Sequence, residues 1–383
     1  MIRFDELESD MHQLPKTRIK VIGVGGAGCN TINSMIGQST SDIDFLAVNT
    51  DAQSLSVSKA CAKLQIGMKA TKGLGSGANP ELGKKAAEED LEKITQLVGD
   101  CDMVFLTGGL GGGTGSGALP VFARILKQLN ILTVCLVSRP FVFEGKRRAK
   151  IAQDAYTELH SGVDTLLVIP NQKLLDVVGG KPTLLEAFEM VNQTISGLVF
   201  SISDIITRPG HINVDFADIK TIMKNMGSAI MGTGSASGED RCIKATMQAI
   251  NSPLLENMDI VGAKSILISI KGNENLGLDE VSRAASIIYE KAHEDANIIL
   301  GSVIDSALGD QMSVTVIATG FDHALQAEAA LPRAGTLDTM SVQKTMMVSE
   351  IKKDAVPMKI AAMMCDQLDI PAIMRQKQSE QQL

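Results

Sequence analysis

The chain has 383 residues, 44% hydrophobic content and a formal net charge of −8, so it can bury a full core and form two domains. The acidic balance, with two tyrosines and no tryptophan, argues against nucleic acid as a partner, because little basic or base-stacking surface is available. Six scattered cysteines without a C-x-x-C pair favour a reducing cytoplasm and give no zinc motif. An acidic start, and apolar runs far shorter than about 20 residues, predict a cytoplasmic protein without direct membrane insertion.

After an N-terminal extension, residues 1–17, short apolar runs and helical patterns alternate from residue 18 to about residue 168. This alternation predicts an α/β domain with a doubly wound parallel sheet, in which ligands lie at the carboxyl ends of the strands. We expect the domain to span residues 18–183. The expected strands are Ile19–Val24, Phe45–Asn49, Met103–Leu106, Leu132–Val137 and Thr165–Ile169.

The first expected strand ends in a glycine-rich loop, Gly23-Val24-Gly25-Gly26-Ala27-Gly28, which matches G-x-G-x-x-G. With Asp51 at the end of the second strand, the loop fits the dinucleotide fingerprint and leaves open an NAD- or FAD-dependent enzyme. Another glycine segment, Gly73 to Glu81, precedes a helix expected over Pro80 to Leu97, with Asn79 as its N-cap. Alone this segment indicates a turn, but beside other glycine loops it could close over a terminal phosphate.

The most informative segment is residues 108–117, in which seven of ten residues are glycine. It lies between a buried strand, Met103–Leu106, and a helix whose apolar residues recur from Phe122 to Leu129. Glycine amides approach an oxyanion closely, the helix end adds partial positive charge, and Thr114 and Ser116 add hydroxyl donors. The segment therefore predicts a phosphate site. Two such loops at neighbouring strand ends fit one polyphosphate better than a dinucleotide, and the ordinary P-loop motif G-x-x-x-x-G-K-[ST] is absent.

A long helix is expected next, over residues 184–207, followed by a second, smaller α/β domain over residues 208–320. In this domain Ala263 to Ile270 and Ser313 to Thr319 are typical of strands. Asp279 to His293 is expected to be a helix that begins at an N-cap aspartate.

Beyond residue 320 no periodicity persists. Residues 321–366 are expected to be a linker, although six methionines make it less polar than usual for such a segment. The tail, residues 367–383, contains a short apolar cluster from Leu368 to Arg375. A cluster of this kind at the far end of a linker is typical of a peptide that docks on a partner.

Together these segments resemble the FtsZ family, the bacterial tubulin homologues of cell division. The segments are Gly25–Asn30, Gly108–Gly117, Arg139–Gly145, Ile169–Asn171, Asn213–Asp218 and Leu368–Arg375. The resemblance implies a tubulin/FtsZ-like fold that binds GTP/GDP, with Mg²⁺ held through the phosphates. It also implies a head-to-tail homopolymer at the mid-cell division ring. There, membrane-tethering and regulatory division proteins would bind the Leu368–Arg375 cluster.

The resemblance also implies a nucleotide site. Glu144 and Arg148 would contact the ribose, and Phe188 and Asn192 the guanine; many relatives carry aspartate instead of Asn192. From the residues alone, Glu144 to Arg148 is typical of a solvated charge run, and Phe188 of a core position. The other residues that the resemblance places at the nucleotide are Gly25, Gly26, Ala27, Gly28, Cys29, Asn30, Gly109, Gly111, Gly112, Gly113, Thr114, Gly115, Ser116, Gly117 and Asn171.

Asp215 and Asp218 allow two interpretations. Their spacing alone favours a helix start, with one aspartate at the cap and another in the first turn. The resemblance instead implies that this loop enters the next subunit, where Asp215 and Asp218 polarise the attacking water and Asn213 helps to position them. A site completed by the adjacent subunit requires a heterologous interface, which generates open filaments. The alternatives are the NAD- or FAD-dependent enzyme and a non-hydrolysing, tubulin-like structural protein.

Overall fold

The computed structural model describes residues 17–38, 43–178, 182–208, 210, 212, 214–252, 254 and 262–321. The predicted extension 1–17, except residue 17, lies outside the described residues, as do Asn213, the tail and all of the linker but residue 321.

The framework is a sheet of ten strands in the order β3-β2-β1-β4-β5-β6-β7-β10-β8-β9. All neighbours from β3 to β7 pair in parallel, which confirms the predicted doubly wound sheet. The strands are β1 (Ile19–Val24), β2 (Ile43–Asn49), β3 (Ala62–Gln65), β4 (Met103–Gly109), β5 (Leu132–Arg139), β6 (Thr165–Pro170), β7 (Gly227–Ser237), β8 (Ser265–Gly272), β9 (Asn297–Ile304) and β10 (Gln311–Thr319).

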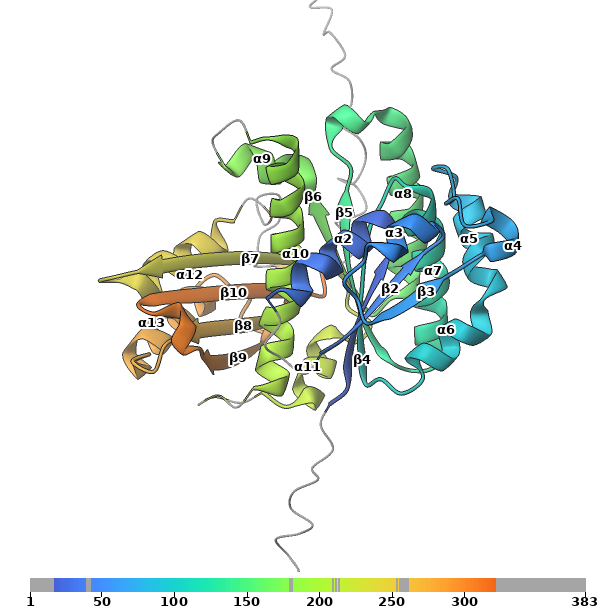
Figure 1. Cartoon of the computed structure of the whole chain (residues 1–383). Coiled ribbons are helices and arrows are strands. Elements are labelled where there is room, and N and C mark those ends of the chain that lie inside the picture. The colour runs from blue at the N-terminus through green and yellow to red at the C-terminus, as the bar shows by residue number, and fades with distance from the viewer. Residues whose placement is uncertain are drawn as a thin grey trace, which may run out of the picture. The chain divides into compact units, whose positions relative to one another are not determined.

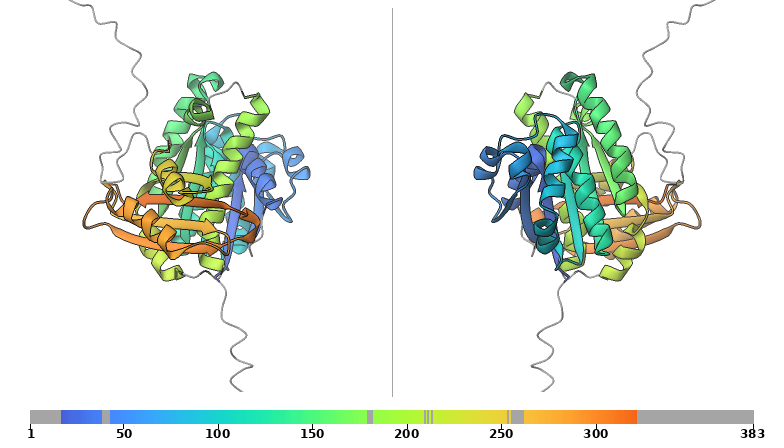
Figure 2. Two further views of the ribbon diagram at one scale, coloured as in Figure 1. Left: turned by 90° about the vertical axis from the view of Figure 1, so that its left-hand side faces the viewer. Right: turned by 90° about the vertical axis from the view of Figure 1, so that its right-hand side faces the viewer.

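Helices cover both faces of the parallel part of the sheet (Figures 1 and 2). Side chains of α2, α10 and α11 share one apolar core with the strands, and those of α5 to α8 share the other. None of the described helices is long and apolar enough to span a membrane. The helices are α2 (Gly25–Ile36), α3 (Ala52–Ser56), α4 (Met68–Thr71), α5 (Pro80–Glu89), α6 (Leu91–Val98), α7 (Gly113–Gln128), α8 (Lys146–Gly162), α9 (Asn171–Val178), α10 (Leu184–Thr207), α11 (Phe216–Met223), α12 (Arg241–Ile250) and α13 (Leu278–Tyr289), with 3-10 turns η1 (Val142–Glu144) and η3 (Ser306–Leu308).

The second α/β region has its own core, formed by β7, β8 and β10 with α12 and α13. Its strands join the first region through β6 and β7, which pair over only three residues. The strand β10 lies antiparallel between β7 and β8, and β9 forms the edge.

The structure differs from the expected elements at two helices. The helix expected over Pro80 to Leu97 is two helices, because the chain turns at Asp90, whose carboxylate accepts a hydrogen bond from the Gly67 amide at 2.8 Å. The prediction that Asp279 is the N-cap of a helix was wrong, because α13 begins at Leu278 and its N-cap is Gly277. Strands β3, β7 and β9 were not predicted.

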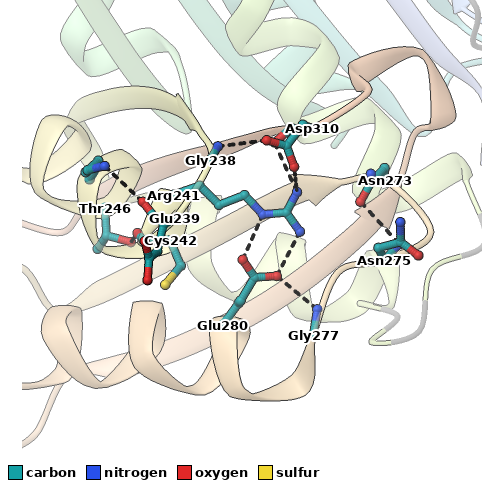
Figure 3. A network of polar contacts seen from close by, with 11 residues as sticks. Gly238, Glu239, Arg241, Cys242, Thr246, Asn273, Asn275, Gly277, Glu280 and Asp310 are labelled. Atoms are coloured by element: carbon teal, nitrogen blue, oxygen red, sulfur yellow. Dashed lines mark hydrogen bonds and ion pairs between the residues drawn. The ribbon is translucent and has the colours of Figure 1, made fainter.

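One buried arginine ties the second region together (Figure 3). Arg241 begins α12, and its guanidinium donates to both carboxylate oxygens of Glu280 on α13, at 2.7 and 2.8 Å. It also donates to the carbonyl of Asp310 at 3.0 Å and to the carboxylate of Asp310 at 3.4 Å. The two carboxylates accept further hydrogen bonds from the amides of Gly277 and Gly238. Each acidic group therefore has a charged and a backbone partner.

Replacing Glu280 with glutamine is expected to lower the free energy of unfolding by about 2–4 kcal/mol, because it leaves the buried Arg241 charge without its main counter-ion. The hydrogen bonds from Arg241 hold the pKa of Glu280 below its ordinary value. The pair therefore stabilises the fold fully above the unfolded-state pKa, about 4.3, and this contribution is lost as pH falls through the folded value. Urea unfolding at pH 7 and at a pH below about 4 measures both effects.

The matched control is Asp279→Asn, in the same helix turn. Asp279 pairs with Arg283, but its side chain is 73% exposed, so its change is expected to stay within about 0.5 kcal/mol. Equal losses in the two variants would contradict the role given to the buried pair.

Candidate functional site

A cleft of about 410 Å³ opens at the carboxyl ends of β1 and β4. Each of these strands leads into a helix whose first turn borders the cleft: α2 follows β1 directly, and α7 follows β4 after a short loop. Of the residues predicted to contact a nucleotide, fourteen line it: Gly25, Gly26, Ala27, Asn30, Gly109, Gly112, Gly113, Thr114, Gly115, Glu144, Arg148, Asn171, Phe188 and Asn192.

The two glycine loops meet at one end of the cleft. A Cβ added to Gly25 would lie 3.1 Å from the Gly115 amide nitrogen, and one added to Gly115 would lie 2.5 Å from the Gly109 carbonyl oxygen. Side chains are therefore excluded where the loops touch. A Cβ on Gly26 or Gly112 would instead meet no atom within 4 Å, so open space lies beside their backbone. Bare amides at two helix N-termini are suited to a phosphate chain.

Three hydroxyl groups lie together beside the glycine loops. Thr114 Oγ1 lies 2.7 Å from Thr50 Oγ1 and 3.0 Å from Ser76 Oγ. Ser76 belongs to the third glycine segment, and it lines the cleft together with Thr114. The Gly73–Glu81 segment, which could close over a terminal phosphate, thus lies against the glycine loop at residues 108–117.

Aromatic rings and amides form another part of the lining. Phe188, near the start of α10, is 40% exposed and packs edge-on against Phe141, with ring centroids 5.2 Å apart. Asn192, one turn later, accepts a hydrogen bond from Thr31 Oγ1 at 3.0 Å. Asn171 is buried, and its Oδ1 has no hydrogen-bond partner in the described part of the chain. An exposed ring face and an unused acceptor are suited to a flat, polar base.

Glu144 and Arg148 also line the cleft, and they pair with each other. Arg148 Nη1 donates to Glu144 Oε2 at 2.5 Å, and Glu144 Oε1 accepts from the Phe141 amide at 2.9 Å. The Glu144 side chain is only 14% exposed, while that of Arg148 is half exposed. The run of charges is therefore not simply solvated: its carboxylate is fixed next to the cleft.

Asp215 and Asp218 lie far from this cleft. Asp215 occupies the N-cap position of α11, but its side chain makes no capping hydrogen bond, and both carboxylates are exposed. Phe188 lies near the start of α10, and Figure 1 shows α11 beside the other end of that helix. At about 1.5 Å per residue, α10 separates them by roughly 30 Å. The two aspartates cannot reach the cleft of their own chain.

Comparison with known proteins adds independent evidence. Residues 18–179 match the GTPase domain of the Tubulin/FtsZ family, and residues 227–322 match the FtsZ family C-terminal domain. The structure is similar to an empty FtsZ dimer from M. jannaschii, with 42% identity, a TM-score of 0.79, and coverage of 84% of this chain and 93% of that one. The chain belongs to the FtsZ family. A GTPγS-bound CetZ2 protofilament from Haloferax volcanii shares the fold, at 21% identity and a TM-score of 0.69 over 81% of this chain and 96% of that one.

The GTPase-domain match covers both glycine loops, so the dinucleotide alternative is not favoured. Asp51, the acidic residue on which that alternative relied, caps α3 instead. Its carboxylate accepts from the Gln53 amide at 2.9 Å and from Ser54 Oγ at 2.7 Å. Asp51 is not part of the cleft lining.

Five predicted nucleotide residues of this FtsZ-family chain lie behind the lining. A Cβ on Gly28 would lie 2.7 Å from the Thr107 carbonyl oxygen, and one on Gly117 would lie 2.0 Å from that of Pro80. The Ser116 hydroxyl accepts from the Gly111 amide at 2.8 Å, and Gly111 has a positive φ of 97°. Cys29 is buried, and burial raises its thiol pKa to about 11. These residues, Gly28, Cys29, Gly111, Ser116 and Gly117, shape or pack the loops.

Sequence reasoning left out seven residues of the lining: Val24, Thr31, Ser76, Leu110, Ser138, Pro140 and Val191. Ser76 lies in a segment that the glycine pattern had already marked. Thr31 follows Ala27 by one helical turn, so the start of α2 could have indicated it. Val24, Leu110 and Pro140 lie inside segments that the sequence motifs had already marked, and Val191 adjoins Asn192. Ser138 carries no signal in the sequence.

Proposed function

We propose that this chain is a GTP-dependent, self-assembling cytoskeletal GTPase that forms head-to-tail filaments of the bacterial division ring. GTP is hydrolysed to GDP and phosphate at the interface between subunits. One observation carries the proposal: the cleft and the exposed carboxylates lie at opposite ends of α10. A second copy that places its α11 end over the cleft supplies the missing carboxylates, and repetition of that contact produces a filament.

GTP lies with its phosphates against the N-termini of α2 and α7 and its guanine beside Phe188. The glycine loops bind the phosphates through backbone amides. Glu144 accepts from a ribose hydroxyl, and Arg148 offers a planar set of donors. The amide of Asn192 supplies a donor and an acceptor for the edge of the base, and Asn171 supplies a buried acceptor.

Hydrolysis uses the aspartates of the adjacent subunit. Asp215 and Asp218 orient and polarise the attacking water, and Asn213 helps to position them. Mg²⁺ would be held through the phosphates, and the hydroxyl groups of Thr50, Ser76 and Thr114 beside the glycine loops could add hard oxygen donors. Mg²⁺ when bound offsets phosphate charge.

Sedimentation of the purified chain tests this function. We expect polymer in the pellet with GTP and Mg²⁺, and none with ATP, GDP or no nucleotide. Equal polymer with ATP would contradict guanine recognition by Phe188 and Asn192. Monomer under all conditions would contradict the filament itself.

The rest of the organisation follows the family pattern. Residues 18–183 form the GTP-binding domain, 184–207 the central helix and 208–320 the domain with the catalytic loop. The linker 321–366 carries the tail, whose Leu368–Arg375 cluster binds membrane-tethering and regulatory division proteins. This docking concentrates a cytoplasmic polymer at mid-cell.

Deletion of residues 367–383 is expected to abolish binding to a membrane tether and to leave GTP-driven sedimentation unchanged, since the catalytic and nucleotide residues all lie before residue 220. Co-sedimentation of filaments with a division-site membrane anchor measures the first effect. Undiminished anchor binding by the truncated chain would rule out the docking role.

A further inference from the structure

The connection from α10 to α11, which carries Asp215 at its end, starts from residues held by ion pairs. At the last turn of α10, Asp204 is 5% exposed and pairs with Lys271 of β8, at 2.7 Å. Its other oxygen lies 3.2 Å from Nε of Arg208, the residue that ends the helix. Arg208 also lies 3.7 Å from a carboxylate oxygen of Asp305, just after β9. The start of the loop is therefore tied to β8 and to the end of β9.

Ile212, which follows Arg208 by four residues, is held against β9, the edge strand of the described sheet. Ile212 and Ser302 bond twice: the Ser302 amide donates to the Ile212 carbonyl at 3.1 Å, and the Ile212 amide donates to Ser302 Oγ at 3.1 Å. The Ser302 side chain thus takes the place of a strand carbonyl as the acceptor for the loop. Ser302 is only 4% exposed, so water is a poor substitute for its hydroxyl.

The next contact lies one residue before the catalytic aspartate. Val214 is 5% exposed and packs against β9. A Cβ added to Gly301 would lie 3.0 Å from a methyl carbon of Val214 and 3.0 Å from one of Ile205 on α10. The absence of a side chain at residue 301 therefore sets how closely Val214 approaches the sheet.

We propose that Ser302 and Gly301 of β9 are positioning residues for hydrolysis, acting through the backbone of the loop on the place of Asp215. The inference rests on the proposed function, in which Asp215 acts on GTP bound by the next subunit. Asp215 directly follows Val214, and its carboxylate makes no capping bond. Its carbonyl accepts hydrogen bonds from the amides of Asp218 and Ile219 in α11, so its location is set jointly by that helix and by the contacts that precede it. Small displacements of a catalytic group have large effects on rate.

Ser302→Ala tests the inference in the full-length chain. We expect turnover per polymerised subunit to fall about tenfold or more, while the KM for GTP and the critical concentration for assembly change less than twofold. Ser302→Thr keeps the hydroxyl acceptor and is expected to restore most of the turnover. Gly301→Ala, which pushes Val214 away by a different route, is expected to lower turnover with the same unchanged KM.

Ser269→Ala is the matched control. Ser269 lies on β8 in register with Gly301, is 2% exposed, and has a hydroxyl without a partner in the described part of the chain. We expect turnover by this variant to equal that of the unmodified chain. Equal slowing by Ser302→Ala and Ser269→Ala, or normal turnover by Ser302→Ala, would overturn the positioning role.

Asp215→Ala in the same assay distinguishes failure of the positioning role from failure of the proposed function. If Asp215→Ala is inactive while Ser302→Ala turns over normally, the inference fails and the proposed function stands. If Asp215→Ala retains normal turnover, the proposed function itself fails.

Discussion

Replacing Asp215 with alanine is expected to reduce GTP turnover by about 1000-fold, within the range for loss of a group that handles the proton of an attacking water. GTP affinity should stay within about threefold, because Asp215 lies at the other end of α10 from the cleft of its own chain. Asp215→Asn should be nearly as inactive, since it keeps the size of the side chain and removes the charge. Phosphate release measures the turnover and nucleotide binding measures the affinity, both on the same preparations.

An exposed acidic residue elsewhere provides the control for this substitution. Glu290 ends α13 and is exposed, so Glu290→Ala should retain normal turnover. Loss of GTP binding in Asp215→Ala would contradict the division of labour between the two ends of the molecule. Turnover above about a tenth of normal would contradict a catalytic role.

Gly115→Ala is expected to weaken GTP binding at least 100-fold. The added Cβ would lie 2.5 Å from the carbonyl oxygen of Gly109, and because both atoms belong to the phosphate loop, the loop must open to accept it. Displaced amides no longer point at the phosphates, so the anion site at the start of α7 is lost. Titration of a fluorescent GTP analogue, at concentrations too low for assembly, measures the effect.

Gly37→Ala is the matched control for this glycine. Gly37 caps the C-terminus of α2 in a right-handed helical conformation, and the nearest atom to an added Cβ is 3.9 Å away. The affinity of the Gly37→Ala variant for GTP should equal that of the unmodified chain. If Gly115→Ala binds GTP as tightly as Gly37→Ala does, the close approach of Gly115 to the Gly109 carbonyl is not needed for the phosphate site.

The sequence predicted the parts of the site that depend on local pattern. Glycine runs directly after apolar strands mark the loops at residues 25–28 and 108–117, because few other residues permit that conformation and that closeness to a ligand. The long helix expected over residues 184–207 is α10, with the same bounds, because its apolar residues recur at helical spacing.

The parts that escaped prediction depend on contacts across the chain. Residues 227–237 contain glycines and serines that favour no strand, and β7 exists because it pairs with β10 along nine residues. The Thr31–Asn192 hydrogen bond joins residues 161 positions apart. Ser302 shows no motif at all, since its importance lies in the loop that the fold brings against it.

The most direct measurement is the release of phosphate from GTP as a function of protein concentration, with Mg²⁺ present. If the catalytic carboxylates come from the next subunit, release is negligible below a threshold concentration and rises steeply above it, together with sedimentable polymer. Release proportional to concentration from the lowest values upward would mean that each chain carries a complete site. That result would contradict hydrolysis by Asp215 and Asp218 across an interface.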